Sequence, residues 1–184
     1  MIREGYAAVT SRRVEAEAGI KLHYHFGTLD DLFIALVRRL GESNVQLLAD
    51  ALASDEPLRS WWDLASDRRG NMLLVELTAA GNHRPALRAE MAAFAREVRE
   101  MQIDALGPIL DEYGIDAETF PAALVAAMVQ GFAFVMAHDR VAGFDTHQDE
   151  AVAAFERLVD RLEAQRTDRA TGAKGRRTRA ANRG

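Results

Sequence analysis

The chain has 184 residues, 48% of them hydrophobic, with a formal net charge of -5 and no cysteine. The lack of cysteine excludes a disulfide framework, a thiolate metal site and a cysteine nucleophile, and it fits a reducing cytosol. The N-terminal sequence MIREGYAAVT lacks the apolar core of a signal peptide, and no apolar run approaches the roughly 20 residues that span a bilayer. We therefore expect a soluble, cytoplasmic protein with no membrane partner.

The stretch from Thr10 to Phe33 predicts two short helices joined by a glycine turn, with a longer helix behind them. Thr10 is a good N-cap for a helix over 11–18, because its hydroxyl can accept from a free backbone N–H. Gly19 can adopt the positive φ that a sharp turn requires. A second short helix is predicted over 22–27. Two helices joined in this way are typical of helix-turn-helix DNA readers.

The second short helix has an inner face and an outer face. Leu22 and Phe26 are four positions apart and are predicted to face inward. This leaves His23, Tyr24 and His25 to face outward. A metal site at the histidines is excluded, because side chains two positions apart point to different sides of a helix.

The rest of the chain carries helical periodicity, and no run alternates convincingly as a strand. Thr28 is predicted to cap the first long helix, Pro57 to start a later one and Gly114 to end another. We predict an all-α protein. Beyond the first two short helices, the expected helices cover 29–54, 58–68, 70–81, 85–112, 120–142 and 148–165.

The last residues, 166–184, hold seven basic residues and one acidic residue, so the negative charge belongs to the preceding body. This tail has almost no apolar residue that could pack, and we expect it to be disordered. It either adds non-specific attraction to phosphates or is a solvated terminus.

Thr10, the Ala-Gly-Ile of 18–20 and the Leu-His-Tyr-His-Phe of 22–26 together resemble the DNA-binding domain of the TetR family of bacterial transcriptional regulators. Relative to that family, the chain lacks the first turn of the recognition helix and shortens the segment before Tyr6. The resemblance implies an all-α fold with three parts. These are a truncated helix-turn-helix domain over 1–42, a ligand-binding and dimerisation domain over 43–165, and the basic tail. It implies a homodimeric regulator, usually a repressor, that a small apolar molecule releases from double-stranded DNA.

The candidates for contact with DNA lie at the start of the first helix and on the outer face of the second. At the start of the first helix, backbone N–H groups and arginine side chains can hold phosphates. The alternative is an ordinary helix cap with solvated arginines. On the outer face of the second helix, we favour contact with phosphates or bases over packing of a ring against the neighbouring helix. At His25 we favour packing. The DNA-binding candidates are Thr10, Ser11, Arg12, Arg13, Lys21, His23 and Tyr24.

Aromatic and methionine side chains recur through the larger region and suit an adaptable apolar pocket. For each of them alone, core packing is the alternative. The resemblance implies that some line a cavity between the helices, with His83, Arg84, His138 and Asp139 as possible polar fixing points. The ligand-binding candidates are Trp61, Trp62, Met72, Leu73, Phe94, Met101, Met128 and Phe132.

The helices over 120–142 and 148–165 are the candidates for a homodimer interface, which the resemblance implies. The first has alanine, glycine and larger apolar residues on several faces, so it can be buried on more than one side. The alternative is burial within a single chain.

We do not expect an enzyme, and we expect neither a cofactor nor a metal. The sequence has no zinc-protease spacing, phosphate loop, nucleotide fingerprint or nucleophile elbow, and no histidine follows a glutamate by three positions. The alternative function is a helical protein that binds small molecules or dimerises without reading a specific DNA sequence.

Overall fold

The computed structural model describes residues 4–144 and 146–181. Within these residues there are seven α-helices, two short 3₁₀ helices and no strand, so the all-α prediction is confirmed. In chain order the elements are η1 (Tyr6–Ala8), α1 (Ser11–Ala18), η2 (Leu22–Tyr24), α2 (Leu29–Leu52), α3 (Pro57–Ala65), α4 (Arg68–Gly81), α5 (Pro85–Tyr113), α6 (Ala122–Val141) and α7 (Gln148–Ala181).

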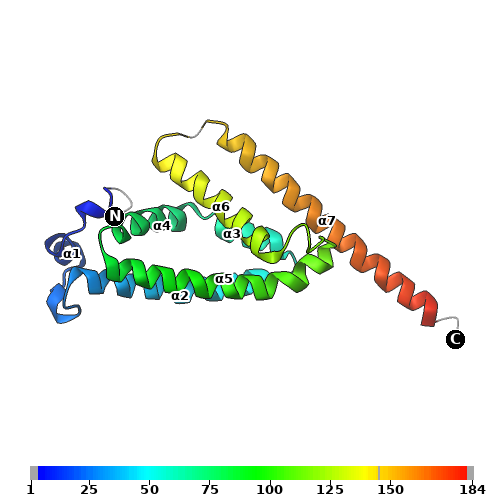
Figure 1. Cartoon of the computed structure of the whole chain (residues 1–184), viewed down its shortest axis with the longest axis horizontal. Coiled ribbons are helices and arrows are strands. Elements are labelled where there is room, and N and C mark those ends of the chain that lie inside the picture. The colour runs from blue at the N-terminus through cyan, green and yellow to red at the C-terminus, as the bar shows by residue number, and fades with distance from the viewer. Residues whose placement is uncertain (1–3, 145, 182–184) are drawn as a thin grey trace.

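The molecule is elongated, with α2 and α5 packed side by side along its length (Figure 1). The short N-terminal elements lie at one end of this pair, and the far end of α7 projects at the other (Figure 1). Helix α5 also packs against α4, α6 and α7, which makes it the centre of the bundle.

The main core lies where the second half of α5 meets the end of α2 and helices α3, α6 and α7. At its centre the ring of Trp62 lies 5.6 Å from that of Phe132 and 4.4 Å from that of Phe155, measured between centroids. Each of these rings comes from a different helix. Buried aromatic pairs of this kind contribute about 0.5–1.5 kcal/mol beyond the area they bury, so the stack holds α3, α6 and α7 together.

A second, smaller core joins the N-terminal end to the body. It contains Phe33 and Val37 of α2, Leu77 of α4 and Leu87 of α5. Tyr6 packs against it, and its backbone N–H donates to a carboxylate oxygen of Glu76 at 2.6 Å. The N-terminal elements are therefore held by α4 as well as by their own chain connection to α2.

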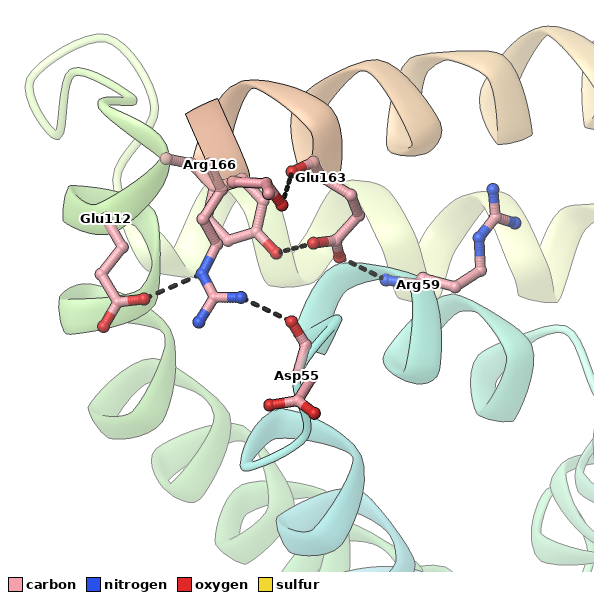
Figure 2. Close-up of polar contacts among 7 residues, drawn as sticks. Asp55, Arg59, Glu112, Glu163 and Arg166 are labelled. Atoms are coloured by element: carbon pink, nitrogen blue, oxygen red, sulfur yellow. Dashed lines mark hydrogen bonds and ion pairs between the residues drawn. The ribbon is translucent and has the colours of Figure 1, made fainter. Parts of the chain in front are cut away.

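A polar network fixes α7 on the body (Figure 2). The buried Glu163 carboxylate accepts from the Tyr113 hydroxyl at 2.6 Å and from the backbone N–H of Arg59 at 3.0 Å. Arg166 donates to Glu112 at 2.9 Å and to the backbone carbonyl of Asp55 at 2.6 Å. One turn of α7 thus binds α3, α5 and the loop after α2.

The largest departure from the predicted elements is the length of α7. The sequence predicts that the last helix ends at 165 and that a disordered tail follows, but in the structure α7 continues to Ala181. Arg166 anchors the turn that follows the predicted end, and the next residues include good helix formers and no proline. Residues 182–184 lie outside the described residues.

Two local predictions also differ from the structure. The helix predicted over 22–27 is a single 3₁₀ turn, Leu22–Tyr24, because Thr28 already adopts the extended backbone of the cap of α2. His25, for which packing is predicted, is exposed, whereas Leu22 is buried as expected. The other predicted helix ends agree to within a few residues.

Helix α6 is 20 residues long and has a mean hydropathy of 1.4 over its most apolar window. By length and composition it is the one helix among the described residues that could cross a membrane, so the expectation of no such run is wrong for α6. One such helix is weak evidence, since core helices share this composition. Ala126, Val129, Ala133 and Ala137 are buried against the bundle, while the opposite face is open.

Candidate functional site

The caps of α1 and α2 are formed by the residues that the sequence predicts. The Thr10 hydroxyl oxygen accepts from the backbone N–H of Arg13 at 3.3 Å and caps α1. Gly19 ends α1 in the left-handed conformation, with φ 68°. Thr28 and Asp31 form a reciprocal capping box at the start of α2. These caps fix where both α1 and α2 begin.

The carboxylate of Glu15 holds the corner between α1 and η2, a role that the sequence does not predict. One oxygen accepts from the backbone N–H of Leu22 at 2.8 Å, and the other lies 3.5 Å from the ammonium of Lys21. His23 Nδ1 lies 3.9 Å away. The bond from Leu22 is the main cause that lowers the pKa of Glu15. Glu15 thus orients η2 relative to α1.

The outer face of this turn carries the predicted DNA-binding side chains. Tyr24 is 77% exposed, and its ring lies 4.2 Å from that of His23 between centroids. Lys21 and His23 are also exposed, as are Ser11 and Arg12 at the start of α1. The structure therefore leaves these five side chains accessible on the N-terminal elements.

The other two candidates, Arg13 and Thr10, make hydrogen bonds within the N-terminal elements. Arg13 donates to a carboxylate oxygen of Glu4 at 2.6 Å and to the carbonyl of Ala8 at 3.3 Å. Its bond to Glu4 raises the pKa of Arg13. The Thr10 hydroxyl serves as the cap described above. For both residues the structure gives a local structural role.

A cavity of about 680 Å³ lies in the body between α2, α3, α4, α5 and α6. Its wall is largely apolar, with leucines from α2 and α4 and the ring of Phe94 from α5. The exposed leucines at its edge are Leu40 and Leu47 of α2 and Leu74 of α4. The size and apolar character fit a small organic molecule, since ligand pockets commonly enclose about 300–1,000 Å³.

The structure brings three of the predicted ligand-binding residues into this wall: Trp61, Leu73 and Phe94. Trp62 and Phe132 are instead in the aromatic stack of the main core, and Met101 packs against that core. Met72 is half-buried outside the wall, and Met128 is 49% exposed on α6.

Gln102 of α5 lines the cavity and is not among the predicted residues. It is 1% exposed, and its amide nitrogen has no hydrogen-bond partner among the described residues. The same holds for the indole nitrogen of Trp61, which is equally buried. A sequence signal existed, because Gln102 follows Val98 by four positions and so interrupts the apolar stripe of α5.

The proposed polar fixing points lie elsewhere. Arg84 forms an ion pair with Asp30 and lies 5.0 Å from the centre of the Phe33 ring. His83 stacks on Tyr6, and His138 contacts Asp139. Arg84 therefore connects the start of α5 to α2, and His83 lies against η1. Among the described residues, no group of three or more potential metal ligands gathers.

The open face of α6 carries an apolar stripe, made of Leu124, Met128, Gly131 and Val135. The three larger side chains are 42–49% exposed, and no described heavy atom outside the helix's own backbone lies within 4 Å of a side-chain carbon built on Gly131. On a helix these positions fall on one face. The structure therefore presents a continuous apolar surface about three turns long.

The cavity and the N-terminal turn share structural elements. Val37 and Leu77 belong to the second core and also line the cavity. Helix α2 begins directly after the turn and runs along the cavity. The cavity wall and the core that holds the N-terminal elements therefore share residues of α2 and α4.

The fold defines this chain as an all-helical protein with an N-terminal helical turn and a cavity within the bundle. Comparison with protein-family models, with curated proteins and with solved structures finds no match to the chain.

Proposed function

We propose that the protein is a cytoplasmic, TetR-like transcriptional regulator whose binding to DNA is controlled by a small apolar molecule. The observation that carries this proposal is the pairing of a capped helix-turn-helix-like corner with a large apolar cavity along one helix, α2. Such a corner is typical of DNA readers, and a cavity of this size is typical of small-molecule sites.

In this proposal Lys21, His23 and Tyr24 face the DNA, with Ser11 and Arg12 on the phosphate backbone. The ammonium of Lys21 supplies positive charge, and the rings of His23 and Tyr24 supply donors and flat surfaces for base edges or sugars. The exposure of all five side chains supports this assignment.

The active form is proposed to be a homodimer through α6 and α7. The apolar stripe of α6 supports this arrangement, since a twofold axis would bring two copies of the stripe together. The dimer would present two N-terminal corners to half-sites about 34 Å apart on the DNA. Each corner alone is small, so binding by both is needed for useful affinity.

We propose that a ligand controls DNA binding through the helices that line the cavity and also pack in the second core. A molecule in the cavity contacts α2 and α4, and both also pack in the second core that holds the N-terminal elements. If the ligand favours a spacing of the corners that does not fit DNA, it releases the protein. A coupling of about 1–3 kcal/mol is typical of such control. Repression relieved by the ligand is the mode we propose.

The test is fluorescence anisotropy with DNA from upstream of the protein's own gene, over a series of salt concentrations and with random-sequence competitor. We expect selective binding that weakens steeply as salt rises. Replacing Lys21 by alanine should lower the slope of log K against log salt by about 0.9 for each phosphate that the lysine neutralises. Arg96→Ala on α5, an exposed arginine far along the chain from the corner, should leave the slope unchanged.

A second function, that of a helical protein that binds a small molecule or dimerises without reading DNA, has its own supporting observation. Glu15 lies against Lys21 and His23, and Glu4 is paired with Arg13. These carboxylates reduce the attraction of the corner for phosphate. A folded dimer that shows no selective binding in the anisotropy assay would favour this second function.

A further inference from the structure

We propose that the cavity takes an uncharged, largely apolar molecule that carries a hydrogen-bond acceptor such as a carbonyl oxygen, and that Trp61 and Gln102 donate to that acceptor. The inference names the ligand class of the proposed function and rests on it for its biological role. The cavity and the two donors are features of the structure and do not depend on the proposed function.

Two hydrogen-bond donors in the cavity wall lack partners among the described residues. The Trp61 indole N–H and the Gln102 amide N–H are both buried in the cavity wall without a partner among the described residues. Buried N–H groups are nearly always hydrogen-bonded, because leaving one unpaired costs stability. Two such groups in the wall of one cavity indicate that the site is completed by a group that accepts hydrogen bonds.

The two donors define the kind of acceptor. An indole nitrogen can only donate, so the partner of Trp61 must be an acceptor. The Gln102 amide can turn its nitrogen toward the cavity by rotation of its last torsion, which is broad. A carbonyl oxygen has two lone pairs and can accept from both residues, whereas a hydrocarbon cannot accept from either.

An uncharged acceptor is favoured over an anion at this position. Asp67 and Arg88, which also line the cavity, are exposed, and Arg99 is half-buried. Neither Trp61 nor Gln102 has a charge. A carboxylate placed between them would lose its hydration and would depend on Arg99, one helical turn before Gln102, for a counter-ion, so its burial costs more than that of an uncharged acceptor. An acidic ligand would instead hold its charge near the exposed Arg88, away from the two donors.

The test uses calorimetric titration of the full chain with three probes of one ring skeleton: tetralone, which has a ketone; tetralin, which has none; and tetralin carboxylate. We expect tetralone to bind about tenfold more tightly than tetralin, the size of one good hydrogen bond. Equal affinity of tetralone and tetralin, tighter binding of the carboxylate, or no binding of any probe to the folded protein would overturn the proposal.

Variants separate the donors from general packing. Gln102→Leu keeps the side-chain size, and we expect it to remove most of the preference for tetralone over tetralin. Because it removes an unpaired buried amide, it should also leave the melting temperature of the ligand-free protein unchanged or raise it by about 2–4 °C. Trp61→Phe should reduce the same preference. Gln46→Leu is the control, because it makes the same substitution on the exposed surface of α2, outside the cavity wall. It should alter neither the preference for tetralone nor the melting temperature.

The binding measurements need no DNA, so their failure is distinct from failure of the proposed function. Tetralone that binds through Trp61 and Gln102 but leaves the DNA anisotropy unchanged would count against regulation by the cavity and support the ligand class. Selective DNA binding by a protein whose Gln102→Leu variant still prefers tetralone would overturn the ligand class and leave the regulator in place.

Discussion

Single side chains decide how α7 is held, and Tyr113 is the clearest case. Its ring is 3% exposed, and its hydroxyl donates to the Glu163 carboxylate. Burial and this bond both raise the pKa of Tyr113 far above its ordinary value of about 10. Arg166 lies over the same ring, 5.6 Å from its centre, so one tyrosine joins the apolar core to the polar network.

Replacing Tyr113 by phenylalanine tests this network. At pH 7 we expect the free energy of unfolding to fall by about 1–3 kcal/mol, because Glu163 loses one of its two donors while it stays buried. Since the pKa of Tyr113 is raised in the folded state, its contribution to stability is complete below pH about 10 and is lost as the pH rises further.

The measurement is urea unfolding of both proteins at pH 7 and at pH about 10.5. The difference in the free energy of unfolding between wild type and Tyr113→Phe should be smaller at the higher pH. Tyr24→Phe is the control, because Tyr24 is exposed and should show little effect at either pH. A difference in the free energy of unfolding that increases with pH would contradict the proposed role of the Tyr113 hydroxyl.

Glu15 has the corresponding role at the other end of the molecule. Its carboxylate both orients η2 and lies next to Lys21, a proposed phosphate contact. We predict that Glu15→Gln strengthens binding to random-sequence DNA several-fold at low salt, since glutamine keeps an oxygen for the Leu22 N–H but removes the negative charge. Glu17→Gln, an exposed change on the same helix, measures the general effect of net charge. Equal gains in both variants would argue against a local effect of Glu15.

At the scale of elements, the contact between α2 and α5 shapes the cavity. Gly41 lies at this contact, and a side-chain carbon there would come within 2.8 Å of the Phe94 ring. The absence of a side chain at Gly41 therefore lets Phe94 lie against α2. Further along the pair, Arg38 and Glu90 form two hydrogen bonds of 2.6 and 2.9 Å, which fix the register of the two helices.

Two glycine-to-alanine changes with opposite expected signs test this contact. Gly41→Ala should destabilise the protein by about 1–3 kcal/mol, because the Phe94 ring must move. Gly131→Ala in α6 meets no described atom outside the backbone of its own helix within 4 Å and should stabilise the protein by about 0.5–1 kcal/mol, as expected inside a helix. Urea unfolding of both variants beside the wild type gives the comparison; stabilisation by Gly41→Ala would show that the two helices pack more loosely than the structure indicates.

At the scale of the whole molecule, α6 is apolar on two sides, and the residues that the structure describes cover only one of them. Its alanines pack toward α4 and α5, while Leu124, Met128 and Val135 remain exposed. Exposed apolar patches of this kind mark interaction surfaces more often than plain surface. A second copy of the chain is the partner that the proposed function requires.

Charge placed on this stripe should separate the copies. We predict that Met128→Asp turns a dimer into a monomer and lowers the affinity for operator DNA by at least about tenfold, because the two corners then bind independently. Sedimentation velocity gives the mass, and anisotropy gives the affinity. Leu47→Asp, a similar change at an exposed leucine of α2, should leave the mass of the dimer unchanged. A dimer that persists in Met128→Asp would place the interface elsewhere.

The sequence alone determined the all-helical fold, most helix ends, the caps at Thr10 and Thr28 and the turn at Gly19. These features depend on residues a few positions apart, which is the range of helix periodicity and capping. Only the tertiary structure decided which side chains line the cavity. Gln102 and Trp61, separated by a whole helix in the sequence, both reach its wall, whereas Trp62 and Phe132 turn into the core. The tertiary structure also decided how α7 is held on the body, since the Glu163 carboxylate accepts from the backbone N–H of Arg59, 104 positions away. A residue's local pattern does not specify which helices pack around it.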